Sequence, residues 1–337
     1  MPADVTIILP IHNAEPYLEQ TARQLEQMST GRHSIEILAV EDHSSDASAA
    51  MLADWVDRFA DVKVLTANDY GVSAARNQAI VAAQGEYVWF ADADDSWDPA
   101  IVEAMLDAAR LAGSDIVVCN ARKVWADGSP AGDIVDAEDA SLLSGADAFV
   151  RLLDGRLQGH LWNKLFKRSL LHAATFPATR AHSDMGGLLA LLPTASAVQL
   201  VPRTLYNYVV HAGSILNSKS YRWDDLTDCL RIAQAASRSA EPSKEGRSAL
   251  LGFKYRQVVI PVANELVRRD SWEQPTAISA VRVANRKSVR VTELFALLRQ
   301  GQAKLALQSA LVRFVPGSYA RLYRRRRTNK WSALDKT

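Results

Sequence analysis

The sequence predicts an α/β protein with a mostly parallel sheet flanked by helices over residues 1–217, followed by a mostly helical region over residues 218–337. Short apolar runs alternate with helical patterns of roughly a dozen residues through the first third of the chain, which is typical of parallel sheets with right-handed crossovers. Polar side chains gather where several of these runs end. From about residue 224 onward the pattern is mostly helical.

The expected strands are short apolar runs, and each is followed by a helical pattern or a turn. Pro10 is expected to close the first strand, and Asp127-Gly128-Ser129-Pro130 to start a loop or a small hairpin that extends to about residue 144. The strands are expected at residues 5–9, 35–40, 62–65, 87–90, 116–119 and, as one or two strands, 200–210.

The composition is that of an ordinary globular protein. The chain has 337 residues, of which 48% are hydrophobic and 23% charged, and this length suits roughly two domains. Two cysteines are too few for a disulfide framework, so a reduced, cytoplasmic setting is expected. The N-terminus lacks the basic region of a signal peptide, and the longest uncharged run, residues 185–201, is too polar for a membrane span.

Charge is distributed unevenly along the chain. Residues 281–337 contain 14 Lys or Arg against two acids, a net charge of +12, so the first 280 residues carry −11 of the overall +1. A basic helix with aromatic anchors can lie on an anionic bilayer. The tail therefore predicts contact with an anionic membrane surface, at the inner face of the cell membrane, with an ordinary solvated helix face as the alternative.

An acidic stretch follows the buried strand at residues 87–90. Asp92 and Asp94 are two residues apart, so an extended backbone would point both carboxylates to the same side. Two oxygen donors at the carboxyl end of a strand suit a hard divalent cation that also holds phosphate oxygens. The alternative is a solvated acidic turn whose aspartates cap the next helix.

Two later segments have both a functional and a structural interpretation. Asp184 precedes an apolar helical run and, from the residues alone, fits a helix cap better than a catalytic role. Trp162 could stack on a sugar ring, but packing in the core is the more ordinary role. His160 and His182 are interpreted as partly exposed polar groups, although either could contact phosphate or an acceptor.

Four motifs appear in order along the chain: Pro10–Glu15, Val40–Asp46, Gly71–Asn77 and Phe90–Asp95. Together they are far more specific than any one alone. With them the chain resembles the family-2 glycosyltransferases of GT-A (Rossmann-like) fold, which are inverting enzymes that use nucleotide-activated sugars. The resemblance covers roughly residues 3–217, and residues 161–168 look like a segment of bacterial surface-polysaccharide members.

The resemblance implies a donor site for a nucleotide-sugar. Pro10, Asn13 and Glu15 would line the pocket for the base and ribose. Asp42 would accept a hydrogen bond from the nucleobase, and Arg76 would face the nucleotide.

The resemblance also implies the catalytic groups. Asp92 and Asp94 match the Asp-x-Asp pair, with Asp94 nearest a Mg²⁺ or Mn²⁺ ion that bridges the diphosphate. Asp184 would be the general base that takes the proton of the acceptor hydroxyl. Candidates on the acceptor side are the consecutive residues Trp162, Asn163 and Lys164.

The sequence departs from the family pattern at three positions. Glu41 replaces the usual first aspartate, and His43 replaces a glycine, a change that can remove a positive-φ turn. Base selectivity is therefore open, with uridine only as the default. Ser183 stands where the family has glutamate, which could loosen the orientation of Asp184.

The predicted function is transfer of a sugar, by inversion, from a nucleotide-diphosphate donor to a hydroxyl of a growing surface polysaccharide or glycolipid. One alternative is a family member that binds nucleotide-sugars without catalysis. Another is a phosphatase-like enzyme with Asp92 as nucleophile, against which the motif's position after the fourth strand counts. The expected partners are the donor and a glycan or lipid-linked acceptor, with no nucleic acid; a homodimer is possible.

Overall fold

The computed structural model describes residues 3–28, 32–179, 182–210, 223–239, 243–268 and 288–334. The chain divides into two compact units, Met1–Asp225 and Leu226–Thr337. Each unit is described by itself below. The boundary predicted after residue 217 lies outside the described residues and stays a prediction.

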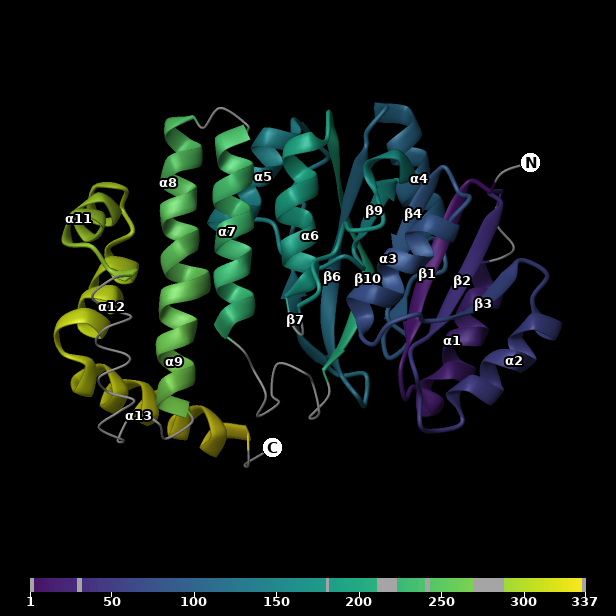
Figure 1. The fold of residues 1–337 in the computed structure, drawn as a ribbon, viewed down its shortest axis with the longest axis horizontal. Coiled ribbons are helices and arrows are strands. Elements are labelled where there is room, and N and C mark those ends of the chain that lie inside the picture. Colours follow the sequence, from purple (N-terminus) through teal and green to yellow (C-terminus); the bar gives the residue numbers. More distant parts are fainter. Residues whose placement is uncertain are drawn as a thin grey trace. The chain divides into compact units, whose positions relative to one another are not determined.

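The first unit is built on one mixed sheet, whose strands lie in the order β3-β2-β1-β4-β9-β6-β10-β5 (Figure 1). The pairs β3-β2, β2-β1, β1-β4 and β6-β10 are parallel. Strand β9 is antiparallel to both β4 and β6, and β7 and β8 add at β6 and β10. The strands are β1 Val5–Ile11, β2 Ile35–Glu41, β3 Val62–Thr66, β4 Tyr87–Phe90, β5 Ser96–Trp97, β6 Ile116–Trp125, β7 Pro130–Ile134, β8 Leu142–Leu143, β9 Lys164–Lys167 and β10 Val198–Val210.

The helices of the first unit cover both faces of the sheet. Alternate residues of β1, from Val5 to Ile11, pack with α1, α2 and α4 in one core, while α3 lies against β1 and β2. From β1 the chain adds β2 and β3 on one side of the sheet and then crosses to add β4 on the other side. At such a switch point the connections leave the carboxyl ends of β1 and β4 in opposite directions, and the crevice between these ends is where such sheets bind ligands. The helices are α1 Glu15–Met28, α2 Ser48–Arg58, α3 Val72–Ala82, α4 Ile101–Ala112, α5 Gly145–Asp154 and α6 Ser183–Leu191.

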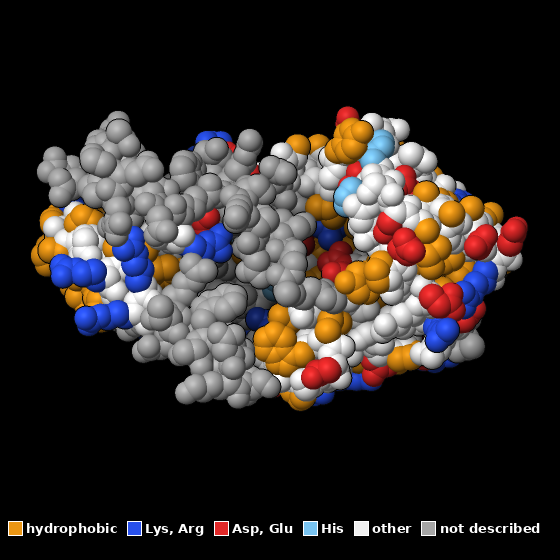
Figure 2. All heavy atoms as spheres, turned by 90° about the horizontal axis from the view of Figure 1, so that it is seen from below, with side chains coloured by type: hydrophobic (Ala, Val, Ile, Leu, Met, Phe, Trp, Pro, Cys, Tyr) orange, Lys and Arg blue, Asp and Glu red, His pale blue; other side chains and the backbone are white. Residues whose placement is uncertain are grey.

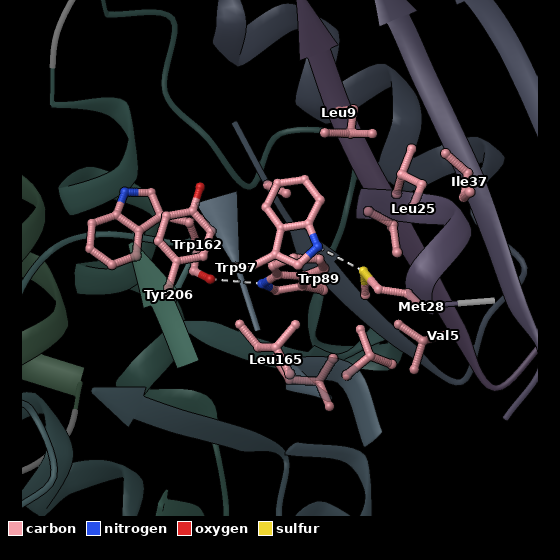
Figure 3. Packing of buried hydrophobic residues seen from close by; sticks show 14 of the residues in the cluster. Val5, Leu9, Leu25, Met28, Ile37, Trp89, Trp97, Trp162, Leu165 and Tyr206 are labelled. Atoms are coloured by element: carbon pink, nitrogen blue, oxygen red, sulfur yellow. Dashed lines mark hydrogen bonds between the residues drawn. The ribbon is translucent and has the colours of Figure 1, made fainter. Parts of the chain in front are cut away.

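Large aromatic side chains fill the core beneath that crevice (Figure 3). The indole of Trp89 is fully buried and donates to the carbonyl of Trp162 at 2.7 Å. The Trp97 indole contacts Met28 Sδ at 2.8 Å, and its ring stacks with Tyr206. These contacts join β4, β5, β10 and the segment before β9 into one rigid base for the loops above it.

The second unit is helical in its described part (Figure 1). Two small apolar clusters hold it together, one around Val267 and Val312 and the other around Tyr255 and Leu297. No helix in the described ranges is long and apolar enough to cross a bilayer. The helices are α7 Trp223–Ser239, α8 Lys244–Phe253, α9 Ile260–Arg268, α11 Val291–Arg299, α12 Ala303–Phe314 and α13 Pro316–Leu334, with a π-helical segment Lys254–Val259.

The predicted fold class is confirmed, with local differences. Strand β1 continues through Pro10, which pairs with Val40 of β2; pairing with β4 ends at Ile8, so Pro10 lies where β1 has a strand on one side only, a position that tolerates a residue without an N–H. Strand β6 runs on to Trp125 and forms a hairpin with β7. Strand β9 was not predicted, since the residues 164–167 form it only by pairing with two strands distant in sequence.

Candidate active site

Polar side chains collect at the carboxyl ends of β1, β2 and β4, the edge that the strand order marks as the ligand crevice. His12 and Asn13 follow β1, Asp42 follows β2, and Asp92 follows β4. Figure 2 shows a hollow on one face of the molecule in which acidic side chains lie close to a basic one. The hydrogen bonds below establish which groups meet.

Arg76 is the hub of the site. It projects from α3, and its side chain is only 4% exposed. Its Nη2 donates to Asp92 Oδ1 at 3.0 Å, and its Nη1 donates to Asp184 Oδ1 at 2.5 Å. One guanidinium thus brings together the aspartate after β4 and the aspartate at the start of α6, which are distant in the sequence.

The charges of this cluster are unequally balanced. The pKa of Asp92 is raised to about 6, chiefly by burial; Arg76 lowers it, and the nearby charges of Asp184 and Asp94 contribute to the rise. Burial lowers the pKa of Arg76, but the two carboxylates outweigh it and the net shift is upward. The cluster therefore holds one permanent cation between two acids, one of which gains a proton near pH 6.

The backbone after β4 is a tight turn, not the extended segment predicted. The amide of Asp95 donates to the carbonyl of Asp92 at 3.2 Å. Asp92 is half-buried, Asp94 is exposed and Asp95 is buried. The expectation that Asp92 and Asp94 point to the same side by strand alternation rested on the wrong local conformation.

Tyr206 of β10 fixes this turn from below. Its hydroxyl donates to Asp95 Oδ2 at 2.9 Å and accepts the amide N–H of Asp92 at 3.3 Å. The amide of Val209 donates to the other Asp95 oxygen at 2.7 Å. Burial raises the pKa of Asp95 well above its ordinary value. Neither Tyr206 nor Asp95 was predicted as a site residue, because only the pairing of β10 with β5 brings them together.

Asp42 is held at the entrance to α3. Both of its carboxylate oxygens accept the N–H of Gly71, at 3.0 and 2.9 Å. Gly71 precedes α3 with a φ of +101°, a conformation that glycine adopts freely. A buried carboxylate oxygen that accepts one N–H still has a lone pair for a ligand. The same helix therefore positions Asp42 at its start and Arg76 in its second turn.

The three predicted nucleotide-pocket residues lie in β1, in the loop after it and at the start of α1. The side chain of Asn13 accepts from the amide of Ser45 at 2.8 Å, and that of Glu15 accepts from Ala47 at 3.0 Å. Pro10 lies within β1. Asn13 and Glu15 thus tie the loop after β1 to the loop after β2, and their direct contact with a nucleotide stays a prediction.

The substitution of glycine by His43 does not remove the turn. His43 itself has a φ of +54°, and its ring stacks on Tyr70 with the centroids 4.0 Å apart. Glu41 accepts the amides of His43 and Ser44, at 3.2 and 2.5 Å. These contacts compensate for the strain of a side chain in the left-handed region.

The acceptor-side candidates do not fit direct contact with an acceptor. Trp162 is 2% exposed, with its ring between Tyr206 and His160, which agrees with the core-packing alternative. Asn163 and Lys164 are fully buried. They belong to a cluster around Asp136, whose Oδ2 accepts Asn163 Nδ2 at 2.9 Å and Lys164 Nζ at 3.4 Å. Because these residues are buried, they are not at the surface where the sequence-based interpretation placed them.

Asp184 does not cap α6. It lies in the first turn, after His182 at the N-cap position, and no side chain caps that end. Its carboxylate accepts from Arg76 and, at 3.2 Å, from the hydroxyl of the buried Ser183. Ser183 therefore contacts Asp184, although sequence reasoning expected this residue to loosen it.

A short distance along α6, Gly187 allows the helix to pack tightly. A Cβ at this position would lie 2.5 Å from the ring of Phe176. The Phe176 ring packs on Phe90, and its centroid lies 6.0 Å from the guanidinium carbon of Arg76. The backbone N–H and C=O of Phe176 both form hydrogen bonds with the side chain of Asn77 in α3. Phe176 thus couples α6 to α3 and sets how far Asp184 lies from Arg76.

The carboxylates of this site suit a metal ion only if a bound diphosphate supplies further oxygen ligands. Within the described ranges, no three His, Cys, Asp or Glu side chains form a metal site. Asp94 is exposed, and Asp92 has a raised pKa that a nearby cation would lower again. Mg²⁺ commonly takes one or two protein carboxylates and completes its shell with phosphate oxygens and water. The two aspartates fit that pattern.

Sequence comparison decides the family. Residues 6–132 match the family described as Glycosyl transferase family 2. Residues 6–132 therefore form a domain of this family. The chain is 29% identical over 222 residues to the protein EpsH of Bacillus subtilis (strain 168), covering 63% of this chain and 62% of EpsH. It is also 29% identical over 178 residues to the poly(ribitol-phosphate) beta-glucosyltransferase of Bacillus spizizenii, covering 51% of this chain and 27% of that protein.

Structural comparison identifies the fold as GT-A. The structure of S. aureus TarS 1–349 in complex with UDP-GlcNAc superimposes with a TM-score of 0.72, at 17% identity, over 97% of this chain and 92% of that TarS fragment. The mannosyltransferase PcManGT from Pyrobaculum calidifontis, in complex with GDP-Man and Mn²⁺, gives a TM-score of 0.53 at 17% identity, over 96% of this chain and 86% of PcManGT. The sequence match to EpsH spans about 62% of the length of EpsH.

Proposed function

We propose that this protein is an inverting glycosyltransferase that moves a sugar from a nucleotide-diphosphate donor to a hydroxyl of a surface glycan or glycolipid. One observation supports this most strongly: Arg76 bonds both Asp92 and Asp184. Two motifs far apart in the sequence are thereby brought within reach of one substrate. Names of relatives support the substrate class, since the similar Bacillus spizizenii protein is a poly(ribitol-phosphate) beta-glucosyltransferase.

The residues divide the reaction between them. Asp42 would accept a hydrogen bond from the base, and the loops tied by Asn13 and Glu15 would hold the nucleoside. Asp184 would take the proton of the acceptor hydroxyl as that oxygen bonds to the anomeric carbon, a contribution of about 10²- to 10⁴-fold. Arg76 would hold the carboxylate of Asp184 in a fixed orientation before the acceptor binds.

Asp94, with Asp92, would hold Mg²⁺ or Mn²⁺ together with the donor diphosphate. When bound, such an ion neutralises charge on the leaving phosphates. The similar mannosyltransferase PcManGT was solved with GDP-Man and Mn²⁺, and TarS with UDP-GlcNAc, so both bases stay open and UDP is the default.

The test is a donor screen followed by two variants. Product formation from UDP- and GDP-sugars is measured with Mn²⁺ and a panel of simple glycoside acceptors. Asp184→Asn should keep donor binding, seen as a thermal shift, and lose about 10²- to 10⁴-fold in kcat. Asp94→Ala should lose Mn²⁺-dependent donor binding. The control is Asp57→Asn, an exposed carboxylate on α2. Turnover unchanged in both site variants would refute the mechanism.

A second candidate function is nucleotide-sugar binding without transfer. The supporting observation is the 2.5 Å contact of Arg76 Nη1 with Asp184 Oδ1, because this carboxylate oxygen is already occupied by a protein partner and is not free to accept the proton of an acceptor hydroxyl. Donor binding by wild type without any product, across all donors and acceptors of the screen, would favour it.

We also propose that the second unit contacts an anionic membrane surface. Support comes from exposed apolar side chains on α11 and α12, Phe295, Leu298, Leu307 and Phe314, close in sequence to Arg299, Lys304 and Arg313. Residues 281–287 and 335–337 of the predicted basic tail lie outside the described residues. Co-sedimentation with phosphatidylglycerol vesicles, compared with phosphatidylcholine vesicles, tests this. Binding to neither kind of vesicle would refute it. The homodimer stays a prediction.

A further inference from the structure

His160 belongs to a stack of aromatic rings. The ring of Trp162 stacks with Tyr206 and with His160, with centroids 4.6 Å apart in each pair and interplanar angles of 9° and 14°. Tyr208 stacks more loosely on both His160 and Trp162, with centroids 6.3 and 5.9 Å away. Tyr206 and Trp162 are buried, whereas His160 and Tyr208 are half-buried, so His160 lies on the partly exposed side of the stack.

The backbone fixes His160 beside the start of α6. Its carbonyl accepts from the buried Lys164 Nζ at 2.8 Å. Its neighbour Gly159 packs so closely on Met185 that a Cβ would lie 2.5 Å from Met185 Cε. Met185 directly follows Asp184 in the first turn of α6. These contacts place His160 near the first turn of α6, where the charge of Asp184 acts on the imidazole.

The imidazole is uncharged and has no hydrogen-bond partner among the residues that the structure describes. Burial and the positive charge of Lys164 lower the pKa of His160 to about 4. An uncharged imidazole offers one N–H donor and one acceptor nitrogen. A sugar hydroxyl offers the complementary pair, a donor and an acceptor on one oxygen. The ring is chemically suited to a neutral, hydroxyl-rich ligand.

We infer that His160 binds the acceptor, its ring nitrogens forming hydrogen bonds with hydroxyls of the sugar ring that presents its nucleophile to Asp184. This inference rests on the proposed function and adds an acceptor-binding residue to it. A general base must lie within hydrogen-bond reach of the acceptor hydroxyl. A residue beside Asp184 therefore faces the acceptor sugar, and the buried stack beneath holds its ring in place.

The test measures carbohydrate binding without requiring turnover. The methyl β-glycosides of glucose, galactose and N-acetylglucosamine are titrated into the full-length protein with UDP and Mn²⁺ present, and followed by saturation-transfer NMR. His160→Phe keeps a ring that can stack on Trp162 and removes both ring nitrogens. We expect the Kd of the bound glycoside to rise about 3- to 10-fold, as for a lost hydrogen bond. The matched control is His172→Phe, an exposed histidine in a turn.

The outcomes separate this inference from the proposed function. Equal glycoside Kd values in wild type and His160→Phe, or no glycoside binding to wild type, would overturn the inference. A change in the Kd for UDP of the same size as that for the glycoside would also overturn it, because it would place His160 on the donor side. Failure of every UDP- and GDP-sugar to bind wild type would instead refute the proposed function.

Discussion

The first unit contains two buried clusters in which a cation meets carboxylates, and they are built differently. In one, Lys164 is fully buried and donates to the carbonyls of Gln158 and His160, to Asn163 Oδ1 and, at 3.4 Å, to Asp136. In the other, Arg76 donates hydrogen bonds to Asp92 and Asp184, whose side chains are 31% and 27% exposed. The Nε of Arg76 has no hydrogen-bond partner among the described residues.

The difference separates structure from function. Asp136 and Lys164 are both enclosed and have protein partners, so this cluster has no obvious place for a ligand. The Arg76 cluster leaves carboxylate oxygens open to solvent and one buried N–H unused, a state that costs stability unless a substrate completes it. An ion pair by itself does not show whether a cluster is structural or functional. Polar atoms that lack a partner or remain exposed indicate a functional cluster.

The largest expected effect is on the closed cluster. Lys164→Met leaves Asp136 buried without its cation, so the free energy of unfolding should fall by about 3–5 kcal/mol. Urea unfolding followed by tryptophan emission measures it. Lys167→Met is the control, because its 3.5 Å pair with Asp115 is 40% exposed on the lysine and should contribute under about 1 kcal/mol. Similar losses in the two variants would break the comparison.

A smaller loss of stability is expected for the open cluster. Arg76→Met removes the cation between two carboxylates that water already reaches, so we expect a loss of about 1–3 kcal/mol in the same urea assay. Sugar transfer should be abolished, because Asp92 and Asp184 would then repel each other. A stability loss as large as that of Lys164→Met would mean that both clusters are structural.

The open cluster should also titrate. Burial moves the pKa of Asp92 from 3.8 up to about 6, so between these values the folded protein holds a proton that the unfolded chain releases. Stability must therefore fall as pH rises from about 4 to 6 and level off above. Two pKa units correspond to about 3 kcal/mol, and partial exposure reduces this to about 1–2 kcal/mol. Thermal unfolding of wild type and Asp92→Asn from pH 4 to 7 tests it, since the variant should lack this slope.

The smallest expected effect on stability is that of replacing either of two glycines of positive φ, only one of which lies at the proposed site. Gly71→Ala and Gly128→Ala place a Cβ where nothing lies within 4 Å, at φ values of +101° and +83°. Both should cost about 1 kcal/mol of stability through backbone strain alone. Only Gly71→Ala should also weaken nucleotide binding in a thermal-shift titration, because its N–H holds Asp42. Equal nucleotide affinity in the two variants would contradict this.

Much of the fold could be predicted, because it is encoded locally. The runs at residues 5–9, 35–40, 62–65 and 87–90 all form parallel strands, and those of β1, β2 and β4 are apolar over consecutive positions because they are buried on both faces. What could not be predicted depends on distant pairing. The aromatic-amide-lysine motif at residues 162–164 leads into β9 and suggested contact with an acceptor, and only the insertion of β9 between β4 and β6 buries it.

The site could be predicted as a set of motifs but not as a network. Asp92, Arg76 and Asp184 each belong to a recognised segment, yet no local rule indicates that one guanidinium joins them. Asp92 and Asp94 were expected to act alike by their spacing, whereas the turn at Asp95 separates a half-buried carboxylate from an exposed one. Tyr206, which fixes that turn, gave no signal of its own.

The contact between α6 and Phe176 has a consequence for the reach of the proposed base. At Gly187 a single added methyl group would need to occupy space 2.5 Å from the Phe176 ring. The helix could make room only by moving outward, and its first turn would carry residue 184 with it. The spacing between a carboxylate and its cationic neighbour thus depends on a position along the same helix at which the chain has no side chain.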